Sequence, residues 1–411
     1  MLIQNYWGGH EGGAERQCRK QSHALAALGH EVTILTRWPG FPVPLRQTDG
    51  ATGIVRVGWF EPCWRIVQWL KQRLLSASAQ ERRSEVQALH GGAHMAPVGG
   101  KRGILYPVAV LRQGQFILSV WWWVFRHRKK IDIFHVHESH WIAGVGGWLS
   151  RLFGIPVVSK VATFPALPSN HGAEPFKKKW DQERRNIHFI ALNNALKDEL
   201  VAEGIPVRQI SVVPNGVVIP DEVVIPENNK NCLFIGNFSQ GKRKGFDVLF
   251  SAWEKIYADF PDSKLILLGG GDAGYWQEIV RKNHMEEAVD FVGFTAEVDR
   301  HVSEAAFLAL PSRFEGMSNA LLESMSYGLP AVVSDIPANI ELVTDGVNGR
   351  VVPVEDIDRM AAVMRELLGD DVQRKRLGAE ARETIQSQYA IEAVAKKISL
   401  VYEFLKSKAV L

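Results

Sequence analysis

Apolar residues change their spacing in a regular order at the start of the chain. Residues 2–6 form a short apolar run, and a Gly-rich turn follows at 8–13. Residues 14–28 then place apolar side chains at helical spacing, and residues 31–35 form a second apolar run. A strand, a Gly-rich loop, a helix and a second strand in this order predict the opening of a doubly wound sheet.

The pattern breaks between residues 59 and 130. This segment holds six of the 13 Trp residues, many Lys and Arg residues, and a Gly-rich stretch at 91–103. We interpret it as a largely helical insertion in the first domain. Its most apolar part, residues 108–125, is interrupted by Arg112 and two Gln residues. We therefore expect a surface-seeking or buried helix there and not a membrane span.

Alternating strands and helices return after the insertion, in two series separated by a polar stretch at 220–231. The first series predicts strands at 131–136, 156–161, 188–192 and 210–213, with helices at 144–153 and 195–203. The second predicts strands at 232–235, 264–268, 289–292, 307–310 and 331–334, with helices at 246–259, 275–283 and 320–327. Three helices close the chain, at 356–368, 371–388 and 391–408. Because single cores stop growing at roughly 250–300 residues, 411 residues favour more than one domain.

Composition and charge indicate the redox state of the compartment and the class of partner. The chain is 46% hydrophobic and 23% charged, as in ordinary globular proteins. Its three Cys residues are widely spaced, which favours a reducing compartment over a disulfide framework or a zinc site. Residues 1–7 lack the features of a signal peptide. The net charge of +3 divides into +10 over residues 65–130 and −7 elsewhere, which predicts a basic patch that faces an anionic partner.

The clearest chemical signal lies at 312–323, directly after the apolar run at 307–310. Glu315 falls in the turn, Ser318 or Asn319 can cap the next helix, and Glu323 lies one turn into that helix, away from its apolar face. Two carboxylates thus flank a helix N-terminus, whose free N–H groups attract an anion. A nucleotide sugar matches this arrangement. Taken alone, the pattern fits two solvated surface carboxylates equally well.

Glu315 and Glu323 also have the spacing of the E-x7-E motif of the GT-B glycosyltransferases, and the chain resembles their large retaining family 4. Other landmarks agree in order. Residues 12–15 resemble the GGxE loop of the family, and residues 135–138 resemble the strand end that carries its active-site His. Residues 213–217 resemble the PNGVD boundary motif, and residues 236–245 resemble the GR…KG phosphate loop. Residues 328–334 and 345–349 resemble landmarks further along the chain. The resemblance covers nearly the whole chain except residues 40–130.

The resemblance implies an α/β fold of the GT-B type, in which two Rossmann-like domains face a central cleft. Residues 1–217 would form the acceptor-side domain, with the Trp-rich insertion at 59–130. Residues 218–390 would form the nucleotide-sugar-binding domain, and a C-terminal helix at 391–411 would pack back on the first domain.

The resemblance also assigns roles to single residues. His137 would sit beside the donor sugar, Glu315 would hold sugar hydroxyls, and Lys244 would neutralise the diphosphate; these three form the expected catalytic set. Glu323 would bind the ribose, and Gly13 would approach the diphosphate from the opposite domain. The implied donor-binding set is Gly13, Arg243, Gly316, Met317, Ser318, Asn319 and Glu323.

The chain departs from the family at one position. The family has Arg in the phosphate loop where this chain has Asn237, and the loop from there to Lys244 is one residue longer. We expect Arg243 or Lys242 to supply the missing charge.

The activity implied is that of a retaining hexosyltransferase. It would use a nucleotide sugar such as a UDP- or GDP-sugar as co-substrate, with no metal or other cofactor, and would act on a lipid-linked or polysaccharide-precursor acceptor. Two alternatives remain from other classes: a sugar-nucleotide epimerase of the same architecture, which needs no acceptor, and a catalytically silent nucleotide-sugar-binding protein.

The basic, Trp-rich insertion has two interpretations. It either docks on an anionic membrane surface, as Trp and clustered basic residues favour, or completes a core beneath a solvated face. No nucleic-acid-binding module accompanies the charge, so nucleic acid is not an expected partner. We expect a cytoplasmic protein, peripheral at the inner face of the membrane.

Overall fold

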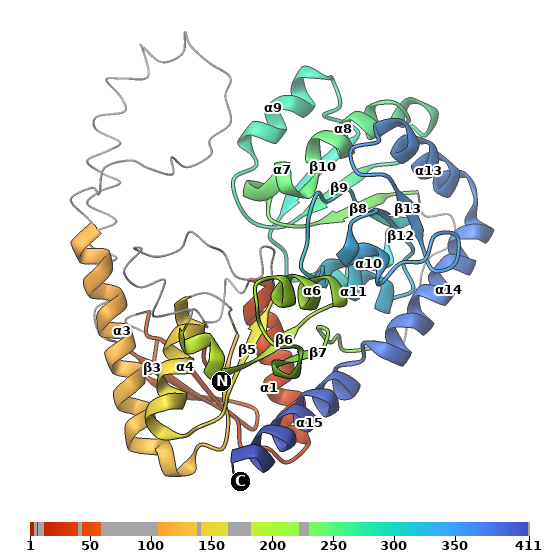
Figure 1. Cartoon of the computed structure of the whole chain (residues 1–411). Coiled ribbons are helices and arrows are strands. Elements are labelled where there is room, and N and C mark those ends of the chain that lie inside the picture. Colours follow the sequence, from red (N-terminus) through yellow and green to blue (C-terminus); the bar gives the residue numbers. More distant parts are fainter. Residues whose placement is uncertain are drawn as a thin grey trace, which may run out of the picture.

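The computed structural model describes residues 1–3, 6, 12–39, 43–58, 106–137, 141–162, 182–221 and 230–409, and all structural statements concern these residues. Most of the predicted insertion, residues 59–105, lies outside them, as does Glu138 of the motif at 135–138. The described chain forms two α/β units, each a mainly parallel sheet with helices against it (Figure 1).

The first sheet contains β1 (Thr33–Arg37), β2 (Arg46–Asp49), β3 (Thr52–Val57), β4 (Phe134–Val136), β5 (Val157–Val161), β6 (Ile187–Ala191) and β7 (Ile210–Val212). Leu2 bridges Leu35 of β1 and Val136 of β4, both in parallel, so the order is β2-β3-β1-Leu2-β4-β5-β6-β7. Both β5 and β6 are buried at every position, as expected of parallel strands covered on two faces. Only the edge strand β2 runs antiparallel.

The second sheet contains β8 (Cys232–Ile235), β9 (Leu265–Leu268), β10 (Val289–Gly293), β11 (Phe307–Leu310), β12 (Ala331–Ser334) and β13 (Arg350–Val352). All are parallel in the order β10-β9-β8-β11-β12-β13, the strand order of a Rossmann fold. The order reverses between β8 and β11, and in such sheets ligands bind outside the carboxyl ends of the strands at this reversal. The loops that follow β8 and β11 are therefore where a ligand is expected.

Helices of the first unit are α1 (Gly13–Ala27), α3 (Tyr106–His127), α4 (Trp141–Phe153) and α6 (Asn194–Ala202). The second unit contains α7 (Gly241–Lys244), α8 (Phe246–Glu254), α9 (Gly274–Lys282), α10 (Val298–Ser303), α11 (Asn319–Ser326), α12 (Pro337–Ile340), α13 (Ile357–Gly369) and α14 (Asp371–Gln388). The last helix, α15 (Ile391–Ala409), begins where the chain returns to the first unit. Short 3₁₀ turns occur at Arg128–Lys130, Arg184–Asn186, Val207–Gln209, Phe238–Gln240 and Tyr257–Asp259. No helix in the described ranges has the length and apolar character needed to cross a membrane.

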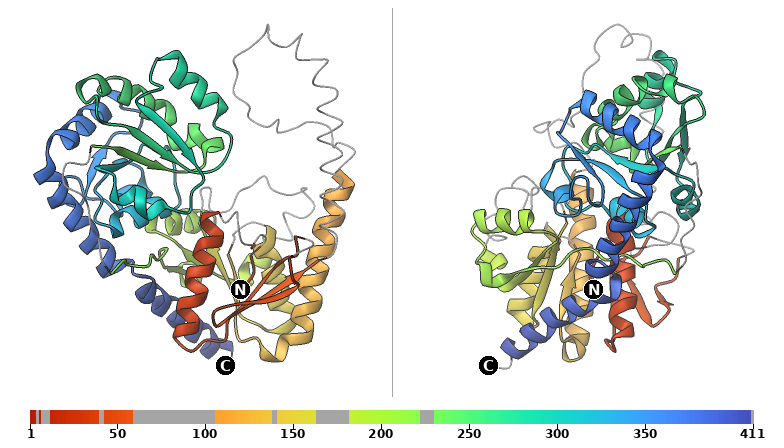
Figure 2. Two further views of the ribbon diagram at one scale, coloured as in Figure 1. Left: turned by 180° about the vertical axis from the view of Figure 1, so that it is seen from behind. Right: turned by 90° about the vertical axis from the view of Figure 1, so that its right-hand side faces the viewer.

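The chain crosses between the units twice, and the two crossings pair with each other. Val217 donates a backbone hydrogen bond to Tyr389 and accepts one from Ile391. A side chain at Gly216 would meet Ile391 at 2.7 Å, so these two segments approach each other at a glycine. Beyond this point α15 packs against α1 of the first unit (Figure 2). Its Tyr402 hydroxyl hydrogen-bonds His135 Nδ1 at 2.6 Å.

Most predicted elements match the structure, and the exceptions have local reasons. The predicted strands at 232–235, 307–310 and 331–334 coincide with β8, β11 and β12. The predicted helix at 246–259 ends at Glu254 and gives way to a 3₁₀ turn. The strands β2, β3 and β13 have no predicted counterpart. Since β2 is an edge strand with mostly exposed polar residues, it lacks the apolar run that marks a buried strand.

Gly245 should be essential to the junction between the loops after β8 and β11. Its φ is +75°, and a Cβ there would lie 2.0 Å from the Pro311 carbonyl oxygen. We expect Gly245→Ala to lower the free energy of unfolding by about 2 kcal/mol or more, from the positive φ and the clash together. Chemical denaturation measures this. In the control Gly270→Ala, the new Cβ meets nothing within 4 Å, so an equal loss there would contradict the explanation.

Candidate active site

The loops after β8 and β11 are joined directly. Arg313, in the loop after β11, donates its backbone N–H to the Arg243 carbonyl at 2.9 Å. Its guanidinium binds both carboxylate oxygens of Asp247, at 2.9 and 3.0 Å. These contacts place α7, which carries the basic residues, against the turn that contains Glu315.

Glu315 gathers two cations at this junction. Its carboxylate is 5% exposed and is hydrogen-bonded by Lys244 Nζ, by the Ser312 hydroxyl at 2.9 Å and by Arg243 at 3.2 Å. Phe314 lies beneath the Arg243 guanidinium, 5.4 Å from ring centroid to Cζ. Removing one partner from a buried ion pair is costly, so the three charges hold one another in place. One carboxylate between two cations leaves a surplus positive charge that suits a phosphate.

The structure separates the two cations that could replace the family's Arg. Lys242 is 69% exposed and pairs with Asp247 at 3.0 Å, whereas Arg243 reaches Glu315. Asn237 has a local role, because its Oδ1 accepts a hydrogen bond from the Ser239 N–H at 2.9 Å and caps the 3₁₀ turn that follows. Arg243 is therefore the cation placed beside Lys244.

Helix α11 begins against the first unit. Ser318, and not Asn319, is its N-cap residue, since the Ser318 hydroxyl accepts from the Leu321 N–H at 3.3 Å. Asn319 donates to the Gly13 carbonyl at 3.1 Å. A Cβ on Gly13 would lie 2.9 Å from that Asn319 amide nitrogen. The N-termini of α1 and α11 thus meet at two residues of the predicted donor-binding set.

Further contacts across the boundary involve residues that sequence analysis did not single out. Lys20 of α1 forms an ion pair with Glu323 at 2.7 Å. Asn193 donates to the Gly316 carbonyl at 2.5 Å. Asn215 donates its side-chain amide to Asn319 at 2.9 Å and its backbone N–H to the Met317 sulfur at 3.3 Å.

No sequence pattern could have paired these residues. The partners lie more than 100 positions apart, and neither spacing nor periodicity marks such a pair. All the predicted residues from Gly316 to Asn319, and Glu323, nevertheless come to this boundary.

A cavity of about 640 Å³ lies between α1 and the segment from β10 to α11. Its lining includes Arg16 and Lys20 from the first unit and Phe294, Thr295 and Glu323 from the second. Its size is in the usual range for small-molecule sites. Glu323 of α11 and Lys20 of α1, which pair with each other, both line this cavity, so the cavity lies at the boundary where the two units meet.

His137 stands apart from this group. It follows β4, is 4% exposed, and stacks on His135 with ring centroids 4.5 Å apart. Its Nε2 lies 3.3 Å from the Met1 sulfur. Burial lowers the pKa of His137 well below its ordinary value, so the ring is neutral at neutral pH. Within the described part of the chain, no hydrogen bond or ring contact joins His137 to the second unit.

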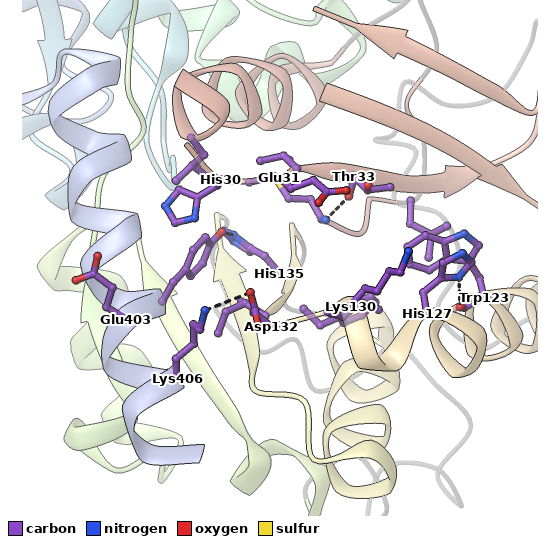
Figure 3. Close-up of a pocket in the computed structure, with 18 residues that line it drawn as sticks. His30, Glu31, Thr33, Trp123, His127, Lys130, Asp132, His135, Glu403 and Lys406 are labelled. Atoms are coloured by element: carbon purple, nitrogen blue, oxygen red, sulfur yellow. Dashed lines mark hydrogen bonds and ion pairs between the residues drawn. The ribbon is translucent and has the colours of Figure 1, made fainter. Parts of the chain in front are cut away.

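A second cavity, of about 450 Å³, lies at the amino ends of central strands of the first sheet. Figure 3 shows His30, Glu31, Asp132 and Lys406 around it, with Asp132 and Lys406 paired at 3.2 Å. It lies at the amino ends of β1 and β4, whereas ligands of parallel sheets bind at the carboxyl ends. It is therefore separate from the candidate active site. In neither region, nor elsewhere among the described residues, do three His, Cys, Asp or Glu side chains gather to hold a metal.

The fold and site define a GT-B glycosyltransferase architecture. Residues 229–370 match the family model described as glycosyl transferases group 1, and residues 12–216 match the glycosyl transferase 4-like domain. The chain belongs to glycosyltransferase family 4, as its motifs predicted.

Known proteins agree with this assignment. A phosphatidyl-myo-inositol mannosyltransferase from Mycolicibacterium smegmatis is 32% identical to this chain over 206 residues. The matched region covers 46% of this chain and 51% of that relative. Sucrose-phosphate synthase from Thermosynechococcus elongatus has a TM-score of 0.69 at 18% identity, over 97% of this chain and 94% of that one. Anabaena Alr3699/HepE in complex with UDP-glucose has a TM-score of 0.68 at 17% identity, over 98% of each chain. These two structures confirm the predicted GT-B fold.

Arg243 and Lys242 form a matched pair for testing the basic cluster. They are neighbours of equal charge, but only Arg243 reaches Glu315. We expect Arg243→Ala to lower kcat for sugar transfer roughly 10²–10³-fold, the usual effect of losing one group that stabilises transition-state charge. Lys242→Ala should stay within about threefold of wild type, because its charge is exposed and screened. Steady-state release of nucleoside diphosphate measures both, and equal losses would contradict the placement.

Proposed function

We propose that this protein is a retaining hexosyltransferase that moves a hexosyl group from a nucleoside-diphosphate sugar to a lipid-linked or saccharide acceptor. The observation that supports this most is the cluster of Arg243, Lys244 and Glu315 at the strand-order reversal of the second sheet. In the transfer, the bond from the anomeric carbon to the diphosphate oxygen breaks, and the acceptor hydroxyl oxygen bonds to that carbon. The diphosphate leaves with the bonding electrons, and the hydroxyl proton is released.

The two cations would act on the leaving group. Negative charge grows on the diphosphate as the bond breaks, so fixed positive charges stabilise the transition state more than the bound substrate. Arg243 and Lys244 are held ready by Glu315 and need no rearrangement at that moment. In this proposal they neutralise the diphosphate without a metal ion, and Glu315 also accepts hydroxyl groups of the sugar.

The nucleoside would occupy the cavity of about 640 Å³ beside Glu323. A carboxylate there can accept both ribose hydroxyls, and hydrogen bonds to a charged group contribute about 1.5–3 kcal/mol. The Lys20 ammonium fixes the Glu323 carboxylate from the other domain. Uridine or guanosine diphosphate sugars both fit this description: the Anabaena neighbour was solved with UDP-glucose, and the mycobacterial relative is named a mannosyltransferase.

A lipid acceptor is favoured by the outer surface of α3, which stands at the edge of the first unit (Figure 1). One face of α3 completes the core, since Phe116, Val120 and Val124 are buried and Trp121 and Trp123 pack against the core. The opposite face is exposed: Leu118 by 65% and Trp122 by 52%. The buried face of α3 fits the interpretation that the segment completes a core, and we propose that the exposed face serves membrane docking.

Basic residues accompany the exposed aromatic face. Arg126 lies over the Trp122 ring at 5.8 Å, and the exposed Arg128, Lys129 and Lys130 follow after His127. Trp favours the headgroup region of a bilayer, and each basic residue near an anionic surface contributes about 1 kcal/mol. We propose that α3 docks on the anionic cytoplasmic surface of a membrane, with the enzyme peripheral to it. The mycobacterial relative is likewise named for a lipid, phosphatidyl-myo-inositol.

The transferase proposal is tested by following the product. Wild-type protein is incubated with UDP-glucose or GDP-mannose and a membrane-lipid extract. We expect mass spectrometry to find a lipid heavier by one hexosyl unit, formed only when donor and acceptor are both present. Proton NMR of that product should show the anomeric configuration of the donor. A stereoisomer of the donor formed without acceptor would indicate an epimerase, and binding without turnover a silent protein.

Docking is tested by sedimentation with vesicles of phosphatidylglycerol or of phosphatidylcholine alone. We expect binding to the anionic vesicles at low salt, weakened at high salt because salt screens the basic residues. Trp122→Ala should reduce that binding several-fold. Tyr275→Ala removes an aromatic side chain of similar exposure, 65%, from α9 of the other unit and should leave binding unchanged. Equal binding to both vesicle types would contradict docking on an anionic surface, and α3 would then have only a structural role.

A further inference from the structure

Asn193 connects the two units through a fully buried side chain. It follows β6 and caps α6, where its Oδ1 accepts the Leu196 N–H at 2.8 Å. Its Nδ2 donates to the Gly316 carbonyl of the other unit at 2.5 Å, and its exposure is 0%. The amide orientation is fixed, because a backbone N–H can only donate and a carbonyl can only accept. One side chain thus both begins a helix and reaches across the boundary.

The bond from Asn193 sets the direction of a peptide group. The peptide between Gly316 and Met317 is planar, so its carbonyl and its N–H point in opposite directions. Fixing the Gly316 oxygen against Asn193 therefore also fixes where the Met317 N–H points. Gly316 brings the least conformational restraint of any residue, so this part of the loop depends on outside contacts for its orientation.

The other cross-boundary contacts do not replace this one. Asn215 reaches the side chains of Met317 and Asn319, and Lys20 reaches that of Glu323. Among the contacts of the described residues, Asn193 is the one that holds a backbone group of the turn between Glu315 and Ser318 from the first unit. While the two units are in contact, a turn of this peptide away from Asn193 would leave the buried Gly316 carbonyl unpaired, which is costly.

We propose that Asn193 is a positioning residue for the donor sugar. Its hydrogen bond across the boundary holds the Gly316–Met317 peptide so that the Met317 N–H faces a donor-sugar hydroxyl, which makes the sugar half of the donor site complete only in the closed arrangement. This rests on the proposed function in one respect, that the turn at 315–318 receives the sugar of a nucleotide sugar. The nucleoside diphosphate is held elsewhere, by Lys244, Arg243 and Glu323.

Asn193→Asp tests this with little structural change. Aspartate is as good an N-cap as asparagine and has the same shape, but it presents an oxygen to the Gly316 carbonyl where the amide donated. Calorimetry would compare UDP with UDP-glucose, and GDP with GDP-mannose. We expect the affinity for the nucleoside diphosphate to stay within about twofold of wild type. The affinity for the nucleotide sugar should fall to that for the nucleoside diphosphate alone. We also expect kcat to drop on the order of 10²-fold, as misplacement of a group by about 1 Å causes in other enzymes.

Asn193→Ser is a second variant without added charge. Its hydroxyl still caps α6 but is one bond shorter, and we expect the same loss of sugar-dependent affinity. Asp356→Asn, which exchanges carboxylate for amide at the N-cap of α13, is the matched control and should change neither affinity. Thermal unfolding establishes that each variant is folded.

The inference is overturned if folded Asn193→Asp and Asn193→Ser keep wild-type affinity for the nucleotide sugar and wild-type kcat. It is also overturned if affinity for the nucleoside diphosphate falls as much as that for the nucleotide sugar, because the whole site would then have collapsed. Failure of the proposed function has a different signature: the wild-type protein itself would then bind neither nucleotide sugar more tightly than its nucleoside diphosphate and would form no glycolipid.

Discussion

The contact between Gly13 and Asn319 is the constraint on which the site depends. It joins the first residue of α1 to the first residue of α11, so the N-termini of two helices from different units share one place. Each N-terminus carries a partial positive charge and unpaired N–H groups. Two of them side by side repel each other unless an anion lies between or beside them. In our proposal the diphosphate of a nucleotide sugar supplies that anion beside the contact.

The basic cluster adds charge from only one side of this boundary. Arg243, Lys244 and Glu315 all belong to the second unit and are held by contacts within it. Among the described residues, the first unit contributes no cation that contacts this cluster; its Lys20 instead pairs with Glu323, which in our proposal binds the ribose. This division suggests an order of events: the second unit binds the nucleoside diphosphate, and contact with the first unit then completes the sugar-binding turn.

The sequence predicted the parts of the site that depend on local chemistry. Glu315 and the turn at 316–319 could be placed because a strand–turn–helix pattern fixes them within one unit, and Lys244 because its loop resembles a family motif. The sequence could not show which of Arg243 and Lys242 reaches Glu315. Successive residues of a helical turn point about 100° apart, and the start of α7 was not predictable. Asn193 and Lys20 could not be found, since their roles arise from residues of the other unit. His137 follows a strand, as expected, and its neighbours in the described chain, which include His135 and Met1, belong to the first unit.

Hydrogen exchange on donor binding measures the central claim, that a nucleotide sugar binds at the boundary and contacts both units. With UDP-glucose or GDP-mannose at saturation, the account predicts slower amide exchange in three separate segments together: 241–245, 316–321 and the first turn of α1 from Gly13. Nucleoside diphosphate alone should protect the first of these most and the turn at 316–321 less. Protection confined to one unit, or centred on the amino ends of β1 and β4 around the second cavity, would contradict it.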